Sequence, residues 1–163
     1  MGDGSMKRCP RKRGGFHYDI QITSSSDIYL KRFNRIFFLL FGIEGRIYRD
    51  VRRDHAYNLI IPNAAVFWYF VSQGMPIGKK GEVDIQDRLR QKERFFHFLK
   101  GMIETDGHVC GRRIQLKQKS RKLLLSITDM LSEHGIKVNE PKVNYTNGKP
   151  FYYIRFDNIY NMP

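Results

Sequence analysis

The sequence contains little of what secreted, disulfide-stabilised or membrane-spanning proteins need. It has 2 cysteines in 163 residues, too few for a disulfide framework and without the paired spacing of a zinc site. Its apolar runs, such as Ile36 to Phe41, are far shorter than the roughly 20 residues that cross a bilayer. Residues 1–15 are polar and basic and do not resemble a signal peptide. We therefore expect an intracellular protein, in the cytoplasm or an organelle, without membrane partners.

Acidic residues are also scarce relative to basic ones. Lys and Arg number 29 against 16 Asp and Glu, so the formal net charge is +13. Such a charge attracts polyanions and indicates a nucleic-acid partner, with an ordinary solvated basic surface as the alternative. Hydrophobic residues make up 41% and aromatic residues 13% of the chain. That composition is typical of a folded domain rather than a disordered basic tail.

Apolar periodicity and turn residues predict alternating helices and strands. Strands are predicted at 16–23, 46–51, 56–61, 108–112, 114–118, 137–145 and 151–156, and helices at 27–41, 64–73, 87–105 and 120–134. The serines at 24–26 and Asn63 are predicted helix caps, and Gly42 and Gly45 are predicted to end the first helix. Asn147-Gly148 is a strong signal for a hairpin.

The two halves of the chain share one order of elements, namely strand, strand, helix, strand, strand. Strand 18–23 corresponds to 114–118 and helix 27–41 to 120–134, so a tandem duplication is the simplest explanation. We assign residues 1–81 to the first repeat and 82–163 to the second. The expected class is α+β, with two pseudo-symmetric halves whose antiparallel sheets lie side by side as a curved basic surface.

The helix predicted at 87–105 ends in an unusual segment, FLKGMIETDGHV, from Phe98 to Val109. One helix face is predicted to carry Phe98, Gly101, Met102 and Thr105, spaced three and four apart, opposite Phe95, Leu99 and Ile103. Small residues let a second helix approach closely. Glycine in mid-helix costs about 1 kcal/mol, which suggests that such an approach compensates for it.

Asp106 stands at the predicted C-terminus of this helix, where the helix dipole disfavours a carboxylate. A divalent cation bound there would resolve that conflict, because carboxylate oxygens are ligands that such ions prefer. Gly107 is expected to adopt the left-handed backbone conformation that ends many helices.

FLKGMIETDGHV resembles the LAGLIDADG motif of homing endonucleases and RNA maturases. The preceding QGMPIGKK, Gln73 to Lys80, resembles the connector of two-motif members, and Gly2-Asp3-Gly4-Ser5 resembles the tail of another motif copy. The resemblance covers nearly the whole chain. It implies the LAGLIDADG fold, in which two αββαββα-type halves form a DNA-binding saddle. It also implies that the first motif helix is mostly missing and that the final helix of the second repeat is short.

The same resemblance implies a site for cutting both strands of a long DNA target. Asp106 and Asp3 would hold Mg²⁺ or another divalent cation, with Thr105 beside them. Gln118-Lys119 match positions that organise water and stabilise charge in the family. The first repeat has Ser24-Ser25 at those positions, and the absence of a lysine weakens one of the two metal sites. The face formed by Phe98, Gly101, Met102 and Thr105 would meet the other motif helix.

Basic residues and one glutamine on strands and turns form the expected DNA-binding surface. They are Lys7, Arg8, Arg11, Lys12, Arg13, Arg46 and Arg49 in the first repeat, and Arg112, Arg113, Gln115, Lys117 and Lys142 in the second. On a strand, Arg113, Gln115 and Lys117 share a face opposite Ile114 and Leu116. That pattern suits a β-ribbon in the major groove, whereas the alternative is an ordinary solvated strand face.

Three explanations fit a first repeat that begins inside its motif. The reading frame is truncated, the gene is decaying, or two chains form a symmetric dimer by pairing their 98–105 helix faces. The main functional alternative is a nucleic-acid-binding protein without cleavage, either an RNA maturase or a DNA-binding regulator. Intein splicing is not indicated, because the chain starts Met1-Gly2 and ends Met162-Pro163 without splicing residues.

Overall fold

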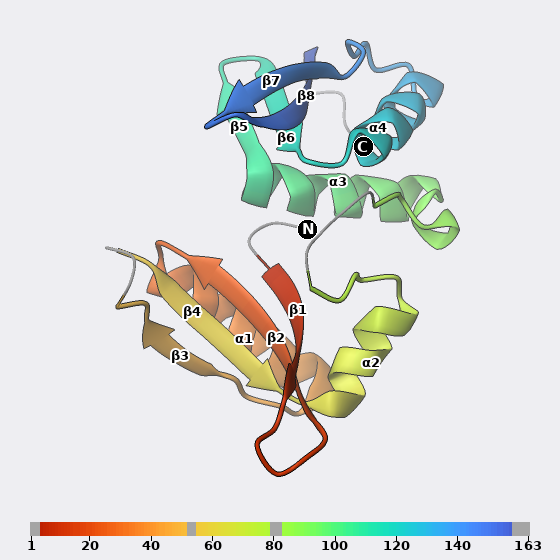
Figure 1. Cartoon of the computed structure of the whole chain (residues 1–163). Helices are drawn as coiled ribbons and strands as arrows, with labels where there is room; N and C mark the ends of the chain where they lie inside the picture. Colours follow the sequence, from red (N-terminus) through yellow and green to blue (C-terminus); the bar gives the residue numbers. More distant parts are fainter. Residues whose placement is uncertain (1–3, 52–54, 79–82, 158–163) are drawn as a thin grey trace. The chain divides into compact units, whose positions relative to one another are not determined.

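The computed structural model describes residues 4–51, 55–78 and 83–157 (Figure 1). Within these ranges no helix is long and apolar enough to cross a membrane. The chain divides into two compact units. We call Asp3–Lys79 the N-terminal unit, and Lys80–Pro163 together with Met1–Gly2 the C-terminal unit. Each unit is described by itself.

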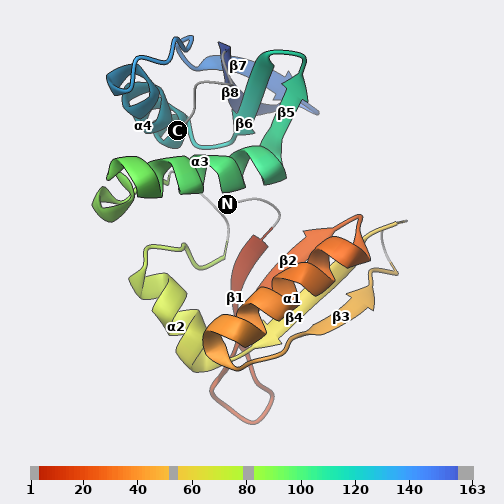
Figure 2. The same ribbon diagram turned by 180° about the vertical axis from the view of Figure 1, so that it is seen from behind.

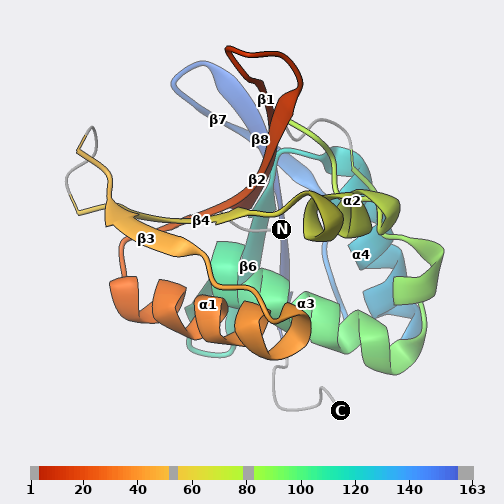
Figure 3. The same ribbon diagram turned by 90° about the horizontal axis from the view of Figure 1, so that it is seen from below.

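The N-terminal unit is built from one antiparallel sheet and two helices. Its strands are β1 (Gly4–Pro10), β2 (Phe16–Ser24), β3 (Arg46–Arg49) and β4 (Tyr57–Pro62), in the sheet order β1-β2-β4-β3. Helix α1 (Asp27–Phe41) lies along one face of this sheet, and α2 (Ala64–Ser72) follows β4 (Figure 2, Figure 3). Strand alternation explains the layering, because Met6, Ile20 and Leu59 turn to the core side and are at most 6% exposed.

The predicted caps set the helix boundaries in this unit. The Ser26 Oγ accepts a hydrogen bond from the Tyr29 backbone N–H at 3.3 Å, and α1 ends at Gly42, whose φ is +67°. The Asn63 side chain caps α2 in the same manner. The prediction of helix 27–41 and of both N-caps is therefore confirmed.

The C-terminal unit repeats the arrangement of the N-terminal one. It contains α3 (Lys92–Asp106), β5 (Gly107–Cys110), β6 (Arg113–Gln118), α4 (Arg121–Glu133), β7 (Lys142–Thr146) and β8 (Lys149–Asp157). The sheet order β5-β6-β8-β7 matches the N-terminal order strand for strand. The strand register agrees as well. Gly4, the first residue of β1, pairs with Ile22 of β2, and Gly107, the first residue of β5, pairs with Leu116 of β6. The predicted repeat of the element order is thus present in the structure, and Ser120, which caps α4, is the equivalent of Ser26.

Helix α3 supplies much of the core of the C-terminal unit. Its Phe95 and Leu99 are fully buried against Ile114 and Leu116 of β6, as the predicted inward face requires. Ile103 packs at the edge of the same cluster. The side chains that α4 and β8 bury in this core are Leu123, Leu124, Ile127, Met130, Leu131, Ile154 and Phe156.

The helix predicted over 87–105 is wrong at its start. Asp87–Leu89 form a separate 3₁₀ turn, η1, and α3 begins only at Lys92. Gln91 between them is extended, with ψ 135°, so the hydrogen-bonded ladder cannot run through it. The apolar periodicity that predicted one continuous helix extends across this break, because Leu89 of η1 also packs on the core.

Two predicted strand limits are also wrong. The strand predicted over 137–145 begins at Lys142, directly after Pro141, because proline has no N–H to donate to a ladder. The strand predicted over 108–112 ends before Gly111, whose φ of +57° belongs to the turn between β5 and β6.

A polar anchor ties the segment before α3 to α4. The Asp84 carboxylate accepts a hydrogen bond from the Ser126 Oγ at 2.5 Å and lies 3.2 Å from the Lys122 Nζ. Burial opposes ionisation of this group. The hydrogen bonds from the Ser126 side chain, the Ile85 backbone N–H and the Lys122 side chain outweigh that effect and hold the pKa of Asp84 below its ordinary value. The anchor fixes Ile85, which is 4% exposed in the core.

Asp84→Asn is expected to lower the free energy of unfolding by about 1 kcal/mol at pH 7, an amount limited by solvent screening of the partly exposed ion pair. Because the pKa of Asp84 is lower in the folded state than in the unfolded state, its ionised form stabilises the fold at pH values above the unfolded-state pKa. This stabilisation is lost as the pH falls through the folded-state pKa. Urea unfolding from pH 7 to pH 3 should therefore show the two proteins converging in acid. Asp87→Asn is the matched control, since that side chain is fully exposed. A pH-independent difference would contradict this role of the carboxylate.

Candidate active site and nucleic-acid interface

The two strongest candidate catalytic residues of the second repeat lie in contact. Asp106 is the last residue of α3, and Gln118 is the last residue of β6. The Gln118 Nε2 donates a hydrogen bond to the Asp106 Oδ2 at 2.5 Å. Both side chains are half-buried. The fold thus brings together an acid and an amide that are separated by a whole hairpin in sequence, and the amide orients the carboxylate.

Gly107 follows Asp106, and its expected left-handed conformation is wrong. Its φ is −86° and its ψ 155°, which is ordinary extended backbone. The residue must be glycine for another reason, because a Cβ there would lie 2.5 Å from the Ile103 backbone oxygen. Gly45, which was predicted to help end the first helix, is subject to the same constraint instead. A Cβ there would lie 2.6 Å from the Ile61 Cγ1. At Gly107 this close approach lets β5 leave directly from the last turn of α3.

The remaining predicted catalytic residues are placed less closely. Lys119 follows Gln118 and is exposed. The Thr105 Oγ1 donates to the Gly101 carbonyl oxygen at 3.0 Å, which is a bond within α3. Asp3 lies outside the described residues. By register, Asp3 stands before β1 in the sequence as Asp106 stands before β5.

Register also assigns the equivalents of Gln118 and Lys119 in the first repeat. Ile22 is equivalent to Leu116, so Ser24 and Ser25 occupy the positions of Gln118 and Lys119. The Ser24 Oγ accepts a hydrogen bond from the Ser26 backbone N–H at 3.1 Å, a local contact before α1. The two repeats therefore differ in the chemistry that they offer at this position.

One of the four residues predicted for a helix interface is wrong. Met102 is 1% exposed and belongs to the core cluster, because it continues the buried stripe of Phe95 and Leu99. Gly101 and Thr105 are exposed and Phe98 is half-buried. A Cβ on Gly101 would meet nothing within 4 Å. The close approach of another helix stays a prediction for Phe98, Gly101 and Thr105.

The sheet of the C-terminal unit has one apolar and one polar face, as predicted for β6. Ile114 and Leu116 are at most 1% exposed, while Arg113, Gln115 and Lys117 lie on the other side. The Arg155 Nε of β8 donates to the Gln115 Oε1 at 3.1 Å. The further residues that this face presents, given by the strand register, are Lys142, Asn144, Phe151 and Tyr153.

Arg155 and Tyr153 were not among the predicted site residues. The Arg155 guanidinium lies 5.1 Å from the centroid of the Tyr153 ring, a cation–π contact beside Gln115. The signal was present in the sequence, because the alternation of the predicted strand 151–156 buries Ile154 and Phe156. Arg155, which lies between those two, and Tyr153, which precedes them, must therefore face the other way.

The sheet of the N-terminal unit also presents a polar face. Lys7 donates through its Nζ to the Gln21 Oε1, and the Gln21 Nε2 donates to the Asn58 Oδ1 at 2.6 Å. The Thr23 Oγ1 donates to the same Asn58 oxygen at 2.7 Å. Asn58 is 2% exposed. This network holds Gln21 at the position equivalent to Gln115, a correspondence that only strand register reveals.

Two predicted DNA-binding arginines lie on the opposite face of that sheet. Arg8 shares the side of Met6, and its guanidinium lies 3.7 Å from the centroid of the Phe16 ring. Arg49 shares the side of the core residue Leu59. Their assignment to the same surface as Lys7 is wrong, because successive strand residues point to opposite faces. The predicted residues that lie on the polar face or in exposed turns are Lys7, Arg46, Arg11, Lys12, Arg13 and Arg112.

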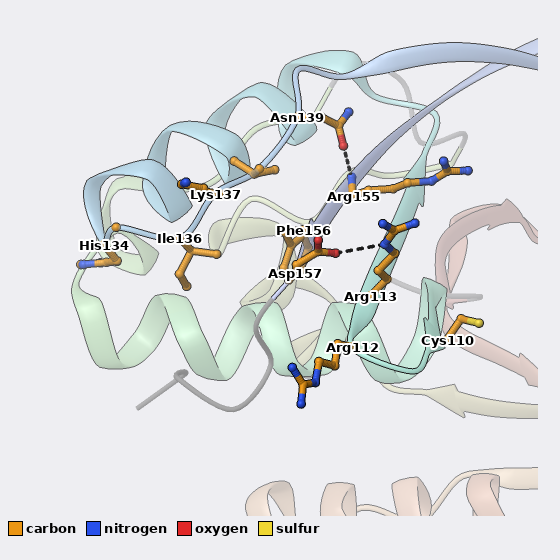
Figure 4. Close-up of a pocket in the computed structure, with 12 residues that line it drawn as sticks. Cys110, Arg112, Arg113, His134, Ile136, Lys137, Asn139, Arg155, Phe156 and Asp157 are labelled. Atoms are coloured by element: carbon orange, nitrogen blue, oxygen red, sulfur yellow. Dashed lines mark hydrogen bonds and ion pairs between the residues drawn. The ribbon is translucent and has the colours of Figure 1, made fainter.

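A cavity of about 1230 Å³ opens at another edge of the C-terminal unit (Figure 4). It lies between the β5–β6 turn, the loop after α4 and the end of β8. Its basic lining residues are Arg112, Arg113, Lys137 and Arg155. The Arg113 Nε lies 3.5 Å from the Asp157 carboxylate, and the Asn139 Oδ1 accepts from the Arg155 backbone N–H at 2.5 Å. Neither Asp106 nor Gln118 lines this cavity.

The described residues at the end of α3 do not by themselves form a complete metal site. The described residues contain no group of three or more His, Cys, Asp or Glu side chains that could hold a metal ion. Hard divalent cations take about six oxygen ligands. Of the described side chains at the end of α3, the Asp106 carboxylate could therefore supply one ligand to such an ion.

Residues 96–161, from α3 onward, match the family model of the LAGLIDADG-like domain. The C-terminal unit thus resembles a LAGLIDADG-like domain. A search of the curated proteins finds no match to it. Among solved structures, mesophilic variants of the homing endonuclease I-DmoI match with a TM-score of 0.70 at 19% identity, covering 96% of this chain and 77% of theirs.

Two further structures show I-DmoI in complex with DNA. The complex with DNA and Ca matches at a TM-score of 0.70 and 18% identity, covering 96% of this chain and 77% of that one. The complex with DNA and Mn matches at 0.69 and 18%, covering 96% and 83%. At these identities the likeness establishes the fold, which is that of the LAGLIDADG homing endonucleases, and the fold predicted from the motif is confirmed.

Proposed function

We propose that this chain is a member of the LAGLIDADG family and a site-specific endonuclease that hydrolyses both strands of a long DNA target with the help of a divalent cation. The observation that carries the proposal is the Asp106 carboxylate, held by the Gln118 amide at the junction of α3 and the sheet. A carboxylate in this position suits a hard cation, whereas it gains nothing from the helix dipole.

Each residue has a distinct task in the proposed reaction. The Asp106 oxygens would bind Mg²⁺ or another divalent cation, which polarises a phosphodiester and activates water. Gln118 keeps the carboxylate in one orientation. Lys119, exposed next to it, places a positive charge where negative charge develops on the phosphate. Asp3 is proposed as the matching acid of the first repeat on the strength of its sequence position.

The polar strand faces are proposed as the DNA-binding surface. Arg113, Gln115 and Lys117 offer a row of hydrogen-bonding side chains on a rigid strand, which suits reading of base edges and contact with phosphates. The I-DmoI structures in complex with DNA support this proposal through the shared fold.

The proposal is tested in two steps. The full chain first selects bound duplexes from a randomised library, and the recovered duplexes are then incubated with the protein in Mg²⁺ or in EDTA. We expect double-strand cleavage at one position with Mg²⁺ and none with EDTA. Selection of a discrete sequence without cleavage under Mg²⁺, Mn²⁺ or Ca²⁺ would overturn the enzyme and leave a binding protein.

A second candidate function is nucleic-acid binding without cleavage, as an RNA maturase or a DNA-binding regulator. Ser24 and Ser25 favour it, because the first repeat lacks the amide and lysine that the second repeat offers. Competition of structured RNA against the selected duplex separates the maturase from the regulator. A homodimer through the 98–105 face is a further proposal. Sedimentation of the wild type and of a Gly101→Leu variant tests it, because leucine would block close approach of a second helix.

A further inference from the structure

The β1–β2 hairpin carries aromatic side chains on the face opposite its polar residues. Phe16 and Tyr18 of β2 lie on the same side of the strand as the core residue Ile20. Phe16 stands at the outer end of the hairpin, beyond the core, and its side chain is 39% exposed. Trp68 of α2, a helix that begins beside this hairpin in Figure 1 and Figure 2, is 44% exposed.

These rings form a continuous row that is anchored in the core. The Tyr18 ring centroid lies 5.5 Å from that of Trp68 and 6.4 Å from that of Phe16. The buried Phe67 ring lies 5.1 Å from Tyr18 and 5.5 Å from Trp68, so the row rests on a fixed neighbour. The Arg8 guanidinium lies over the Phe16 ring, 3.7 Å from its centroid. We call Arg8, Phe16, Tyr18 and Trp68 the hairpin platform.

The charge around the hairpin platform indicates the kind of partner. The basic side chains of residues 4–18 are Lys7, Arg8, Arg11, Lys12 and Arg13, and this stretch contains no acidic residue. Residues 11–13 lie in the exposed turn next to Phe16. Aromatic rings exposed side by side mark an interaction surface, and a concentration of positive charge beside them attracts polyanions. The partner should therefore combine negative charge with flat, stackable groups.

We propose that the hairpin platform binds unpaired bases of a single-stranded nucleic acid. Aromatic side chains stack on every kind of nucleobase, while arginine and lysine beside them contact the phosphates. The bases of a duplex are stacked on each other and do not reach the rings, so this chemistry suits a single strand. RNA and single-stranded DNA share it. The inference concerns the N-terminal unit alone and does not depend on DNA cleavage.

The hairpin platform is separate from the polar face of the same sheet. Lys7 and Gln21 lie on one face of the hairpin, and Arg8 and Phe16 lie on the other. The cation–π contact holds the Arg8 guanidinium against the platform and away from Lys7. A single strand on the platform therefore leaves the polar face free.

The test uses Trp68, the only tryptophan in the sequence, as a reporter placed within the platform. The full chain is titrated with oligothymidylate and with oligouridylate of about 12 nucleotides, a length within the span of such sites. We expect saturable quenching of Trp68 fluorescence, because a base stacked on the indole ring quenches its emission. The oligonucleotide with the lower Kd identifies the sugar that the site prefers. A blunt duplex of the same length should leave the fluorescence unchanged, even where anisotropy shows that it binds.

Substitutions in the platform test which side chains make the contact. Phe16→Ala should weaken binding of a labelled oligonucleotide about tenfold, the effect of losing one stacked base. Phe38→Ala is the matched control, because Phe38 is 50% exposed on α1 and is not part of the platform, and it should change affinity by less than about twofold. Arg8→Gln should weaken binding about threefold at low salt and less at high salt. Circular dichroism checks that each variant is folded.

Four results would overturn the proposal. One is absence of binding of either oligonucleotide to the folded chain, and another is binding that leaves Trp68 fluorescence unchanged. Equal quenching by the duplex would show that unpaired bases are not required. Equal quenching by polyglutamate of the same charge would show that the platform accepts an acidic protein segment instead. Wild-type affinity of Phe16→Ala would contradict the stacking that the proposal requires.

Discussion

Asp106→Asn is expected to reduce the rate of DNA strand cleavage by on the order of 10³-fold, with DNA affinity unchanged or slightly higher. Asparagine keeps the shape of the side chain, and its oxygen still accepts a hydrogen bond from Gln118, so the end of α3 should stay in place. The negative charge that would bind the cation is lost. The measurement is single-turnover cleavage of the selected duplex, with binding measured separately by gel shift.

Glu104→Gln is the matched control for this experiment. Glu104 lies on the same helix, is exposed, and carries the same charge two residues earlier. Its replacement should leave cleavage within about twofold of the wild type, because an exposed charge outside the site is screened by solvent. Cleavage by Asp106→Asn at the wild-type rate would show that this carboxylate takes no part in the reaction.

Affinity for DNA is expected to fall by roughly 10³ to 10⁵ between 50 and 200 mM salt, the range for a protein that neutralises six to ten phosphates. The physical cause is release of counterions from DNA when Lys and Arg side chains replace them. Fluorescence titration with the selected duplex at four or five salt concentrations gives the slope of log affinity against log salt.

Lys117 and Lys31 form a matched pair for that measurement. Lys117→Gln should lower the slope by about one, because this lysine lies on the polar face of β6. Lys31→Gln should leave it unchanged, because Lys31 lies on α1 and bonds to Asp27 at 2.8 Å. Equal slopes for both variants and the wild type would show that DNA does not contact the polar face of β6 at Lys117.

Much of the local structure could be predicted from short-range sequence signals. The serine cap and the glycine after Phe41 define α1 to the residue, because capping geometry depends only on neighbours in the chain. Asn147 and Gly148 have φ of +51° and +70°, as the predicted hairpin turn requires. Alternation in β6 likewise separates Ile114 and Leu116 from the polar face.

Burial and close approach could not be predicted in this way. Met102 belongs to the core although its spacing from Phe98 suggested an interface, because the width of a buried stripe depends on what packs against the helix. Gly107 is glycine because of the Ile103 backbone and not because of its own dihedral angles. Arg8 and Arg49 were placed on the wrong face, since strand register is a property of paired strands.

The sequence by itself determined the fold, the repeated order of elements and the choice of Asp106 as the leading candidate acid, because motif, periodicity and turn chemistry are local. Only the tertiary structure decided that Gln118 holds that acid, that Gln21 and Gln115 are equivalent, and that Ile36 and Leu40 of α1 are exposed. These features depend on contacts between residues far apart in the chain. Such contacts are decided by how strands pair and helices pack.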